Sequence, residues 1–102
     1  MVAFLWTCAT SAQLEVIQYS AEFVKENEIS LKAFKAYDAK TLYMSKASSA
    51  FREKKIKYIP TVVLYYNDEE VLRVESGISL KLPENSIKQI EEKIEEIIES
   101  KF

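Results

Sequence analysis

The chain has 102 residues, of which 48% are hydrophobic and 29% charged, and this composition is typical of one globular domain. It has no histidine and a single cysteine, Cys8, which excludes histidine-ligated metals, Ser-His-Asp triads, Cys-His dyads and an intramolecular disulfide. The net charge of −2 argues against a nucleic-acid-binding surface. We therefore expect one domain over residues 1–102, with no metal, cofactor or nucleic-acid partner.

Hydrophobic patterning predicts two strands and two helices in the first half of the chain. Residues 2–6 form a continuous apolar run, which indicates a short buried strand. Apolar residues then recur at spacings of three and four from residue 14 to residue 24, with Gln18 on the polar side, and predict a helix over 9–26. A second strand is predicted over 29–37 and a second helix over 42–55.

The second half of the chain has the stronger signals. Thr61–Tyr66 is β-branched and aromatic throughout and predicts a strand, which pairs across a turn with a second strand over 71–76. Gly77 ends this hairpin, and Pro83 is placed as the first residue of a helix with an isoleucine stripe. The predicted order is β-α-β-α-β-β-α, which is an α/β fold.

Three segments together resemble the thioredoxin-like family. The strand-to-helix segment Phe4–Ser11 resembles the active-site turn of that family, and Ile59–Tyr65, followed by a hairpin, resembles its cis-proline strand. Gly77 falls where the family often has a glycine before its last helix. The resemblance spans nearly the whole chain and implies a central four-stranded mixed sheet with helices on both faces. It also implies a cis peptide bond before Pro60, in a loop that faces the active-site cysteine.

Cys8 is the candidate nucleophile. A thiol in the first turn of a helix faces unpaired N–H groups and the positive end of the helix dipole, which lowers its pKa from ~8.5 to roughly 3.5–7.5. The thiolate is the species that attacks disulfides. The alternative is that Cys8 is a small buried hydrophobic residue.

Ser11 stands where dithiol members of the family have a second cysteine. Its hydroxyl can donate a hydrogen bond to the Cys8 sulfur but cannot release a mixed disulfide. The resemblance therefore implies a monothiol thiol–disulfide oxidoreductase, or a cysteine-to-serine variant of a dithiol enzyme. Residues 2–5 have no acid of the kind that lies beneath the cysteines in thioredoxins. The glutathione-binding pattern of glutaredoxins is also absent, so we expect glutathione to bind weakly.

The resemblance also assigns residues that bind substrate: Trp6, Thr7, Ala9, Thr10, Ile59, Pro60 and Thr61. Lys57 lies near Pro60 in sequence and is either a contact for an acidic substrate or an ordinary surface lysine. We expect a cytoplasmic monomer that acts on protein disulfides or thiols without binding a membrane, since the apolar run at residues 2–6 is too short for a signal or a membrane span. Two alternatives are a redox-inactive protein-interaction module that uses the same groove and a homodimer linked through Cys8.

Overall fold

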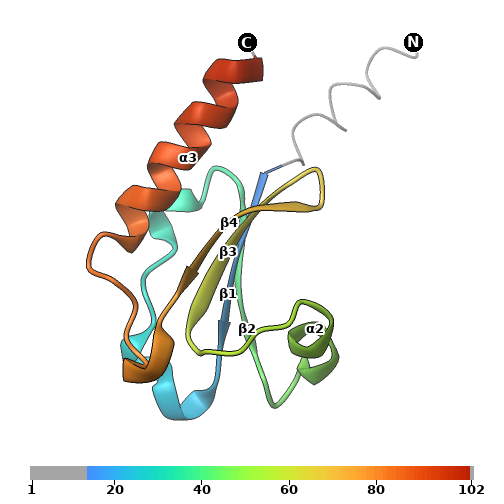
Figure 1. Cartoon of the computed structure of the whole chain (residues 1–102), viewed down its shortest axis with the longest axis vertical. Helices are drawn as coiled ribbons and strands as arrows, with labels where there is room; N and C mark the ends of the chain where they lie inside the picture. Colours follow the sequence, from blue (N-terminus) through green and yellow to red (C-terminus); the bar gives the residue numbers. More distant parts are fainter. Residues whose placement is uncertain (1–13, 102) are drawn as a thin grey trace.

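The computed structural model describes residues 14–101, which form one four-stranded mixed sheet with helices on both faces (Figure 1). The strand order is β2-β1-β3-β4, with β1 parallel to β2 and antiparallel to β3, and β3 antiparallel to β4. The strands are β1 Leu14–Ser20, β2 Asp38–Tyr43, β3 Thr61–Tyr66 and β4 Glu69–Glu75. The α-helices are α2 Ser48–Glu53 and α3 Ser86–Lys101, and the 3₁₀ turns are η1 Glu22–Asn27, η2 Lys32–Phe34 and η3 Gly77–Ser79.

Each face of the sheet has its own hydrophobic core. On one face, Val16, Val62 and Leu64 pack with Phe34 of η2 and with the isoleucine stripe of α3. On the other face, a second cluster contains Ile17, Tyr19, Ala21, Val24, Phe51, Ile59, Val63 and Tyr65. Figure 1 shows α3 to the left of the sheet and α2 to the right. The α/β fold class with helices on both faces is thus confirmed.

The helix predicted over 9–26 is wrong for residues 14–20, which form the central strand β1. The run contains the strand-favouring Val16, Ile17 and Tyr19. Both faces of β1 are buried, because Val16 packs towards α3 on one side of the sheet and Ile17 and Tyr19 pack towards α2 on the other. The polar Gln18 and Ser20 are also buried in this strand, so the hydrophobic pattern is interrupted and imitates a helical spacing.

The second strand and second helix are displaced from their predicted positions. The strand expected over 29–37 is wrong, because that segment contains η2 and the strand β2 begins at Asp38. The helix expected over 42–55 is reduced to α2, because β2 continues to Tyr43 in register with Ser20.

The hairpin predicted in the second half is confirmed, with β4 beginning at Glu69. Asn67 and Asp68 both have positive φ, at 54° and 67°, as the tight turns favoured in hairpins require. The last helix is also confirmed, but it begins at Ser86, so Pro83 precedes the helix instead of being its first residue.

Candidate binding site at the Pro60 end

Four loops of the protein meet at one end of the sheet. Ser20 at the end of β1 pairs with Tyr43 at the end of β2, while Thr61 at the start of β3 is in register with both Tyr19 and Glu75. The loops that follow β1, β2 and β4 therefore lie beside the loop that precedes β3, at the lower end in Figure 1. We call this the Pro60 end and define it by residues 21–24, 44–47, 58–60 and 76–78.

Ile59 and Pro60 form the centre of this end, and the peptide bond between them is cis. The Ile59 side chain is buried in a cluster that includes Ala21 and Val24. Thr61 Oγ1 donates a hydrogen bond to the Tyr58 carbonyl at 2.6 Å and fixes the turn into β3. Within residues 14–101, neither the N–H nor the C=O of Ile59 forms a backbone hydrogen bond.

The loop that packs against Ile59 contains no cysteine. It follows β1 and includes η1, whose sequence is Glu-Phe-Val-Lys-Glu-Asn. Two hydrogen bonds hold the loop: Ser20 Oγ donates to Glu28 Oε2 at 2.8 Å, and Asn27 Nδ2 donates to the Leu80 carbonyl at 2.9 Å. Among the described residues, Ala21 and Val24 of this loop pack beside Ile59 in the proline loop.

The predicted site residues are only partly placed by the structure. Ile59, Pro60 and Thr61 lie together at the Pro60 end. The other predicted site residues lie outside the described part of the chain: Trp6, Thr7, Cys8, Ala9, Thr10 and Ser11. Residues 14–20 are not helical, because β1 begins at Leu14, which pairs with Tyr66 at the end of the sheet opposite Pro60. The predicted helix over 9–26, whose dipole was expected to lower the pKa of Cys8, therefore does not extend through residues 14–20.

Gln18 lies in the strand that leads to this loop and is only 1% exposed. Its amide accepts a hydrogen bond from Ile29 N–H at 2.9 Å and donates to the Ile29 carbonyl at 3.0 Å and to Thr41 Oγ1 at 3.3 Å. These contacts satisfy the polar atoms of the side chain, as a buried amide requires. A neutral amide supplies no proton acceptor to the loop, so its role here is structural.

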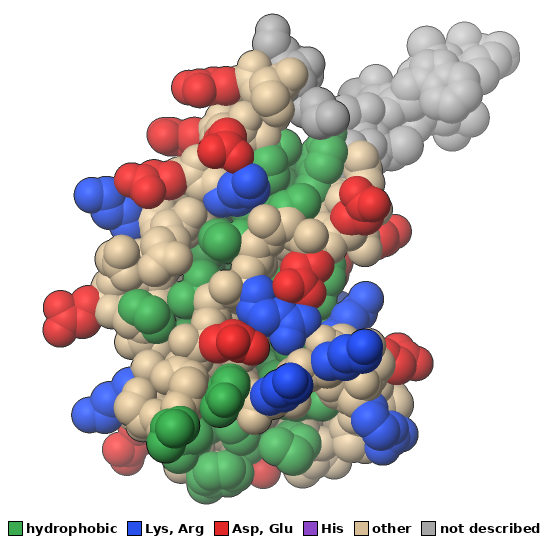
Figure 2. All heavy atoms as spheres, viewed as in Figure 1, with side chains coloured by type: hydrophobic (Ala, Val, Ile, Leu, Met, Phe, Trp, Pro, Cys, Tyr) green, Lys and Arg blue, Asp and Glu red, His purple; other side chains and the backbone are tan. Residues whose placement is uncertain are grey.

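Large apolar side chains are exposed at the Pro60 end. Phe23 is 75% exposed, Ile78 is 91% exposed, and Met44 and Tyr58 are also exposed. They come from four different loops, and Figure 2 shows hydrophobic side chains gathered at the lower end of the molecule. Sequence reasoning missed all four, although Ile78, an apolar residue directly after the turn glycine Gly77, was a detectable signal. Clustered apolar exposure of this kind marks interaction surfaces.

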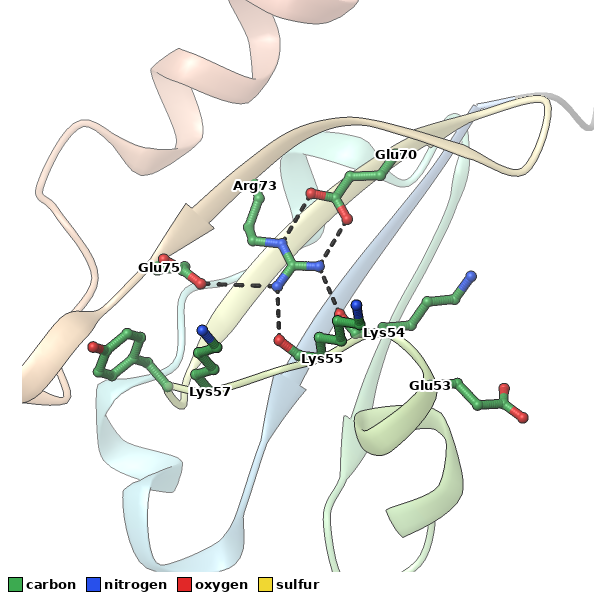
Figure 3. A pocket seen from close by; sticks show the side chains of 8 residues that line it. Glu53, Lys54, Lys55, Lys57, Glu70, Arg73 and Glu75 are labelled. Atoms are coloured by element: carbon green, nitrogen blue, oxygen red, sulfur yellow. Dashed lines mark hydrogen bonds and ion pairs between the residues drawn. The ribbon is translucent and has the colours of Figure 1, made fainter.

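Two open grooves adjoin this end. The apolar groove, of about 390 Å³, is lined by Met44, Ser48, Phe51, Arg52, Ile56, Lys57 and Ile59. The charged groove, of about 560 Å³, is lined by Glu53, Lys54, Lys55, Lys57, Tyr58, Glu70, Arg73 and Glu75 (Figure 3). Lys57 lines both grooves, so they meet at the residues that lead into Ile59.

Arg73 organises the charged groove. Its Nε and Nη2 donate to the two carboxylate oxygens of Glu70 at 2.9 and 2.7 Å, and Nη1 lies 3.8 Å from Glu75 Oε2. The hydrogen bond from this guanidinium holds the pKa of Glu70 below its ordinary value, and Glu70 in turn raises the pKa of Arg73. Arg73 also donates to the carbonyls of Lys54 and Lys55, which ties the loop after α2 to β4.

Within residues 14–101, no group of three or more histidine, cysteine, aspartate or glutamate residues is arranged to hold a metal ion. In the same range, no helix has the length and apolar character needed to cross a membrane.

Comparison with solved structures shows a thioredoxin-like fold. Oxidised thioredoxin from Plasmodium falciparum matches with a TM-score of 0.60 at 17% identity, over 90% of each chain. The germline-specific thioredoxin Deadhead from Drosophila melanogaster matches with a TM-score of 0.65 at 15% identity, over 89% of this chain and 90% of that one. A mutant thioredoxin from Entamoeba histolytica matches with a TM-score of 0.61 at 17% identity, over 90% of this chain and 92% of that one. No family model and no curated protein matches the sequence.

Proposed function

We propose that this protein is an interaction module of thioredoxin-like fold that binds an extended segment of a partner protein at the Pro60 end. The observation that carries the proposal is the set of exposed apolar side chains from four loops around Pro60: Phe23, Met44, Tyr58 and Ile78. The described loop beside the proline, residues 21–27, contributes the apolar Val24 to the cluster around Ile59 and contains no thiol, which supports a binding role. In this proposal the protein acts as a monomer in the cytoplasm, a compartment in which unpaired cysteines are ordinary.

Two physical features favour an extended peptide as the ligand. Covering exposed apolar surface releases about 25 cal/mol per Å², so side chains such as Phe23 and Ile78 contribute when a partner covers them. The N–H and C=O of Ile59 have no backbone partner within residues 14–101, and such groups form strand-like hydrogen bonds with a peptide backbone in other complexes in which a peptide adds to a sheet.

The test is a selection of peptides from a random display library on the immobilised chain, followed by affinity measurements on the selected peptides. Phe23→Ser and Ile78→Ser should each weaken binding about tenfold, because each removes an anchor of the interface. Ile98→Ser is the matched control, since Ile98 is also exposed but lies on α3. Peptides that bind all three variants as tightly as the parent chain would contradict the proposal.

Monothiol exchange by Cys8 is the second candidate, and the structural likeness to thioredoxins favours it. In this reaction the Cys8 thiolate attacks one sulfur of a substrate disulfide. A mixed disulfide forms, the other sulfur leaves as a thiolate, and Ser11 donates a hydrogen bond to the Cys8 sulfur. A protein disulfide is the expected substrate, with oxidised glutathione as a weak one.

Because Cys8 is the sole cysteine, a nitroxide label placed on it tests this candidate directly. Exchange at the proline loop requires the sulfur to approach Ile59 and Thr61, so their amide NMR signals should broaden. Mass spectrometry should also show a mixed disulfide after incubation with oxidised glutathione below pH 7. Unbroadened signals together with an unmodified thiol would reject the candidate.

A further inference from the structure

A run of cations borders the apolar groove. Arg52, Lys54, Lys55 and Lys57 lie at the end of α2 and in the loop that leads to Pro60, and we call these four residues the basic strip. Only one acid, Glu53, interrupts them, although the whole chain has a net charge of −2. Figure 2 shows Lys and Arg side chains gathered beside the hydrophobic lower end.

Within the described residues, the cations of the basic strip form no ion pairs with acidic side chains. The ion pairs within residues 14–101 involve Lys40, Arg73 and Lys93, and none involves a residue of the strip. The ammonium of Lys54 lies 5.2 Å from the centre of the Tyr65 ring and acts electrostatically on Glu70. Glu70 itself is bound by Arg73 through both carboxylate oxygens.

Arg73 makes the strip available to a ligand in two ways. It engages Glu70 and Glu75, the two acids of β4 that line the charged groove together with the lysines. It also donates to the backbone carbonyls of Lys54 at 2.8 Å and Lys55 at 3.2 Å, which fixes the loop. Figure 3 shows these contacts, and its dashed lines end on no lysine ammonium.

The apolar and basic features form one continuous surface. Arg52 and Lys57 line the apolar groove together with Phe51 and Ile59. Lys57 also lines the charged groove, together with Lys54 and Lys55. An apolar side chain bound beside Ile59 therefore lies in the same groove as Lys57, from which the charged groove continues.

We infer that the partner segment is an acidic peptide, in which an apolar anchor for the groove beside Ile59 is followed by aspartates or glutamates that contact the basic strip. This inference rests on the proposed function and names its class of partner. The contribution of the charges is modest, because exposed ion pairs each change affinity by about two- to threefold. Three of them together should change the dissociation constant by about tenfold, and more at low salt.

The test compares three synthetic peptides with the same apolar core and with flanking residues that are all Glu, all Gln or all Lys. Dissociation constants are measured by fluorescence anisotropy at low and at physiological salt. The Glu peptide should bind about tenfold more tightly than the Gln peptide, the Lys peptide should bind most weakly, and added salt should reduce the differences. The combined variant Lys54→Gln, Lys55→Gln, Lys57→Gln keeps only Arg52 of the basic strip, so its preference for the Glu peptide over the Gln peptide should fall from about tenfold to about two- to threefold.

The matched control replaces the same number of lysines elsewhere, as Lys32→Gln, Lys35→Gln, Lys88→Gln, and should keep the preference for the Glu peptide. Equal binding of the Glu and Gln peptides to the parent chain would overturn this inference while leaving the docking site intact. Failure of all three peptides to bind would count against the proposed function itself. Binding of a single-stranded RNA oligonucleotide through the strip, in place of the Glu peptide, would overturn the acidic-peptide assignment.

Discussion

Replacement of Gln18 with leucine distinguishes between two arrangements of residues 14–20: the observed strand β1 and the helix that the sequence pattern predicts. In a helix over 9–26, Gln18 would lie on the polar side, and an exposed substitution there would change stability by no more than about 0.5 kcal/mol. In the structure, Gln18 is 1% exposed and bonds to both backbone groups of Ile29. The two arrangements therefore predict different outcomes for one substitution.

The expected loss of stability follows from the backbone groups that Gln18→Leu leaves without a hydrogen-bond partner. Ile29 N–H and C=O each lose a hydrogen bond, and an unsatisfied buried group costs about 1–3 kcal/mol. Ile29 is only partly buried, so the lower half of that range applies to each group. Burial of the leucine side chain stabilises the variant and offsets about 1 kcal/mol of this loss. The net loss in free energy of unfolding is about 2 kcal/mol, which lowers Tm by about 10 °C.

Urea denaturation followed by circular dichroism measures this loss. Gln89→Leu is the matched control, because Gln89 lies on α3 and its amide bonds only to the exposed Asn85 side chain. The control should change the free energy of unfolding by less than about 0.5 kcal/mol. A Gln18→Leu variant as stable as the parent chain would refute the placement of β1 and with it the loop assigned beside Pro60.

Three further substitutions test the packing and electrostatics around the site. Phe51→Ala should cost about 3–5 kcal/mol in urea denaturation, because Phe51 is 6% exposed and packs edge-on to Tyr19 at 5.2 Å. Burial raises the pKa of Tyr65 and of Tyr19, whose hydroxyls form a hydrogen bond with each other at 2.8 Å. The stability that this pair contributes is therefore complete below pH 10 and is lost as pH rises further. Tyr65→Phe should therefore lower the free energy of unfolding by about 1 kcal/mol at pH 7. In a pH series of denaturation curves, the variant should also lose less stability than the parent chain as pH rises above 10. The hydrogen bond from Arg73 lowers the pKa of Glu70, so the stability that this ion pair contributes is present above pH 4.5 and is lost as pH falls. In the same series, Glu70→Gln should reduce the stability lost on acidification by less than about 1 kcal/mol.

The hairpin and the last helix were predictable from the sequence because local chemistry and tertiary packing agree there. β3 is β-branched and aromatic and is buried at nearly every position. The stripe of α3 places Ile90, Ile94 and Ile97 on one face, and all three are buried against the sheet. In both elements the residues that favour the local structure are the same residues that fill the core.

The first half of the chain was predicted poorly because tertiary contacts decide its structure. Gln18 and Ser20 are buried in β1, and their polar atoms bond to Ile29, 11 residues along the chain, and to Glu28, 8 residues along the chain, in the segment that follows η1. A helical pattern does not contain those partners, so it assigns Gln18 to the polar side of a helix. The short 3₁₀ turns η1 and η2 have no regular periodicity and were read as parts of longer elements.

The candidate site was predictable only where a local motif specifies it. Ile59-Pro60-Thr61 precedes a strong strand and was placed correctly at the start of β3. The sequence assigns the loop that faces Pro60 to the residues around Cys8, which lie outside the described part of the chain; within that part, Ala21 and Val24 pack beside Ile59. Strand order determines which loops meet, and the strand order depends on pairing between segments far apart in the sequence.

The most direct measurement of the binding proposal is an NMR titration of the isotope-labelled chain with a selected acidic peptide. The parent chain and a Cys8→Ser variant are compared in the same experiment. The account predicts that amide shifts change at Phe23, Ile59 and Ile78, and that the two proteins bind with equal affinity. Shift changes confined to α3, or affinity that disappears with the Cys8 thiol, would contradict it.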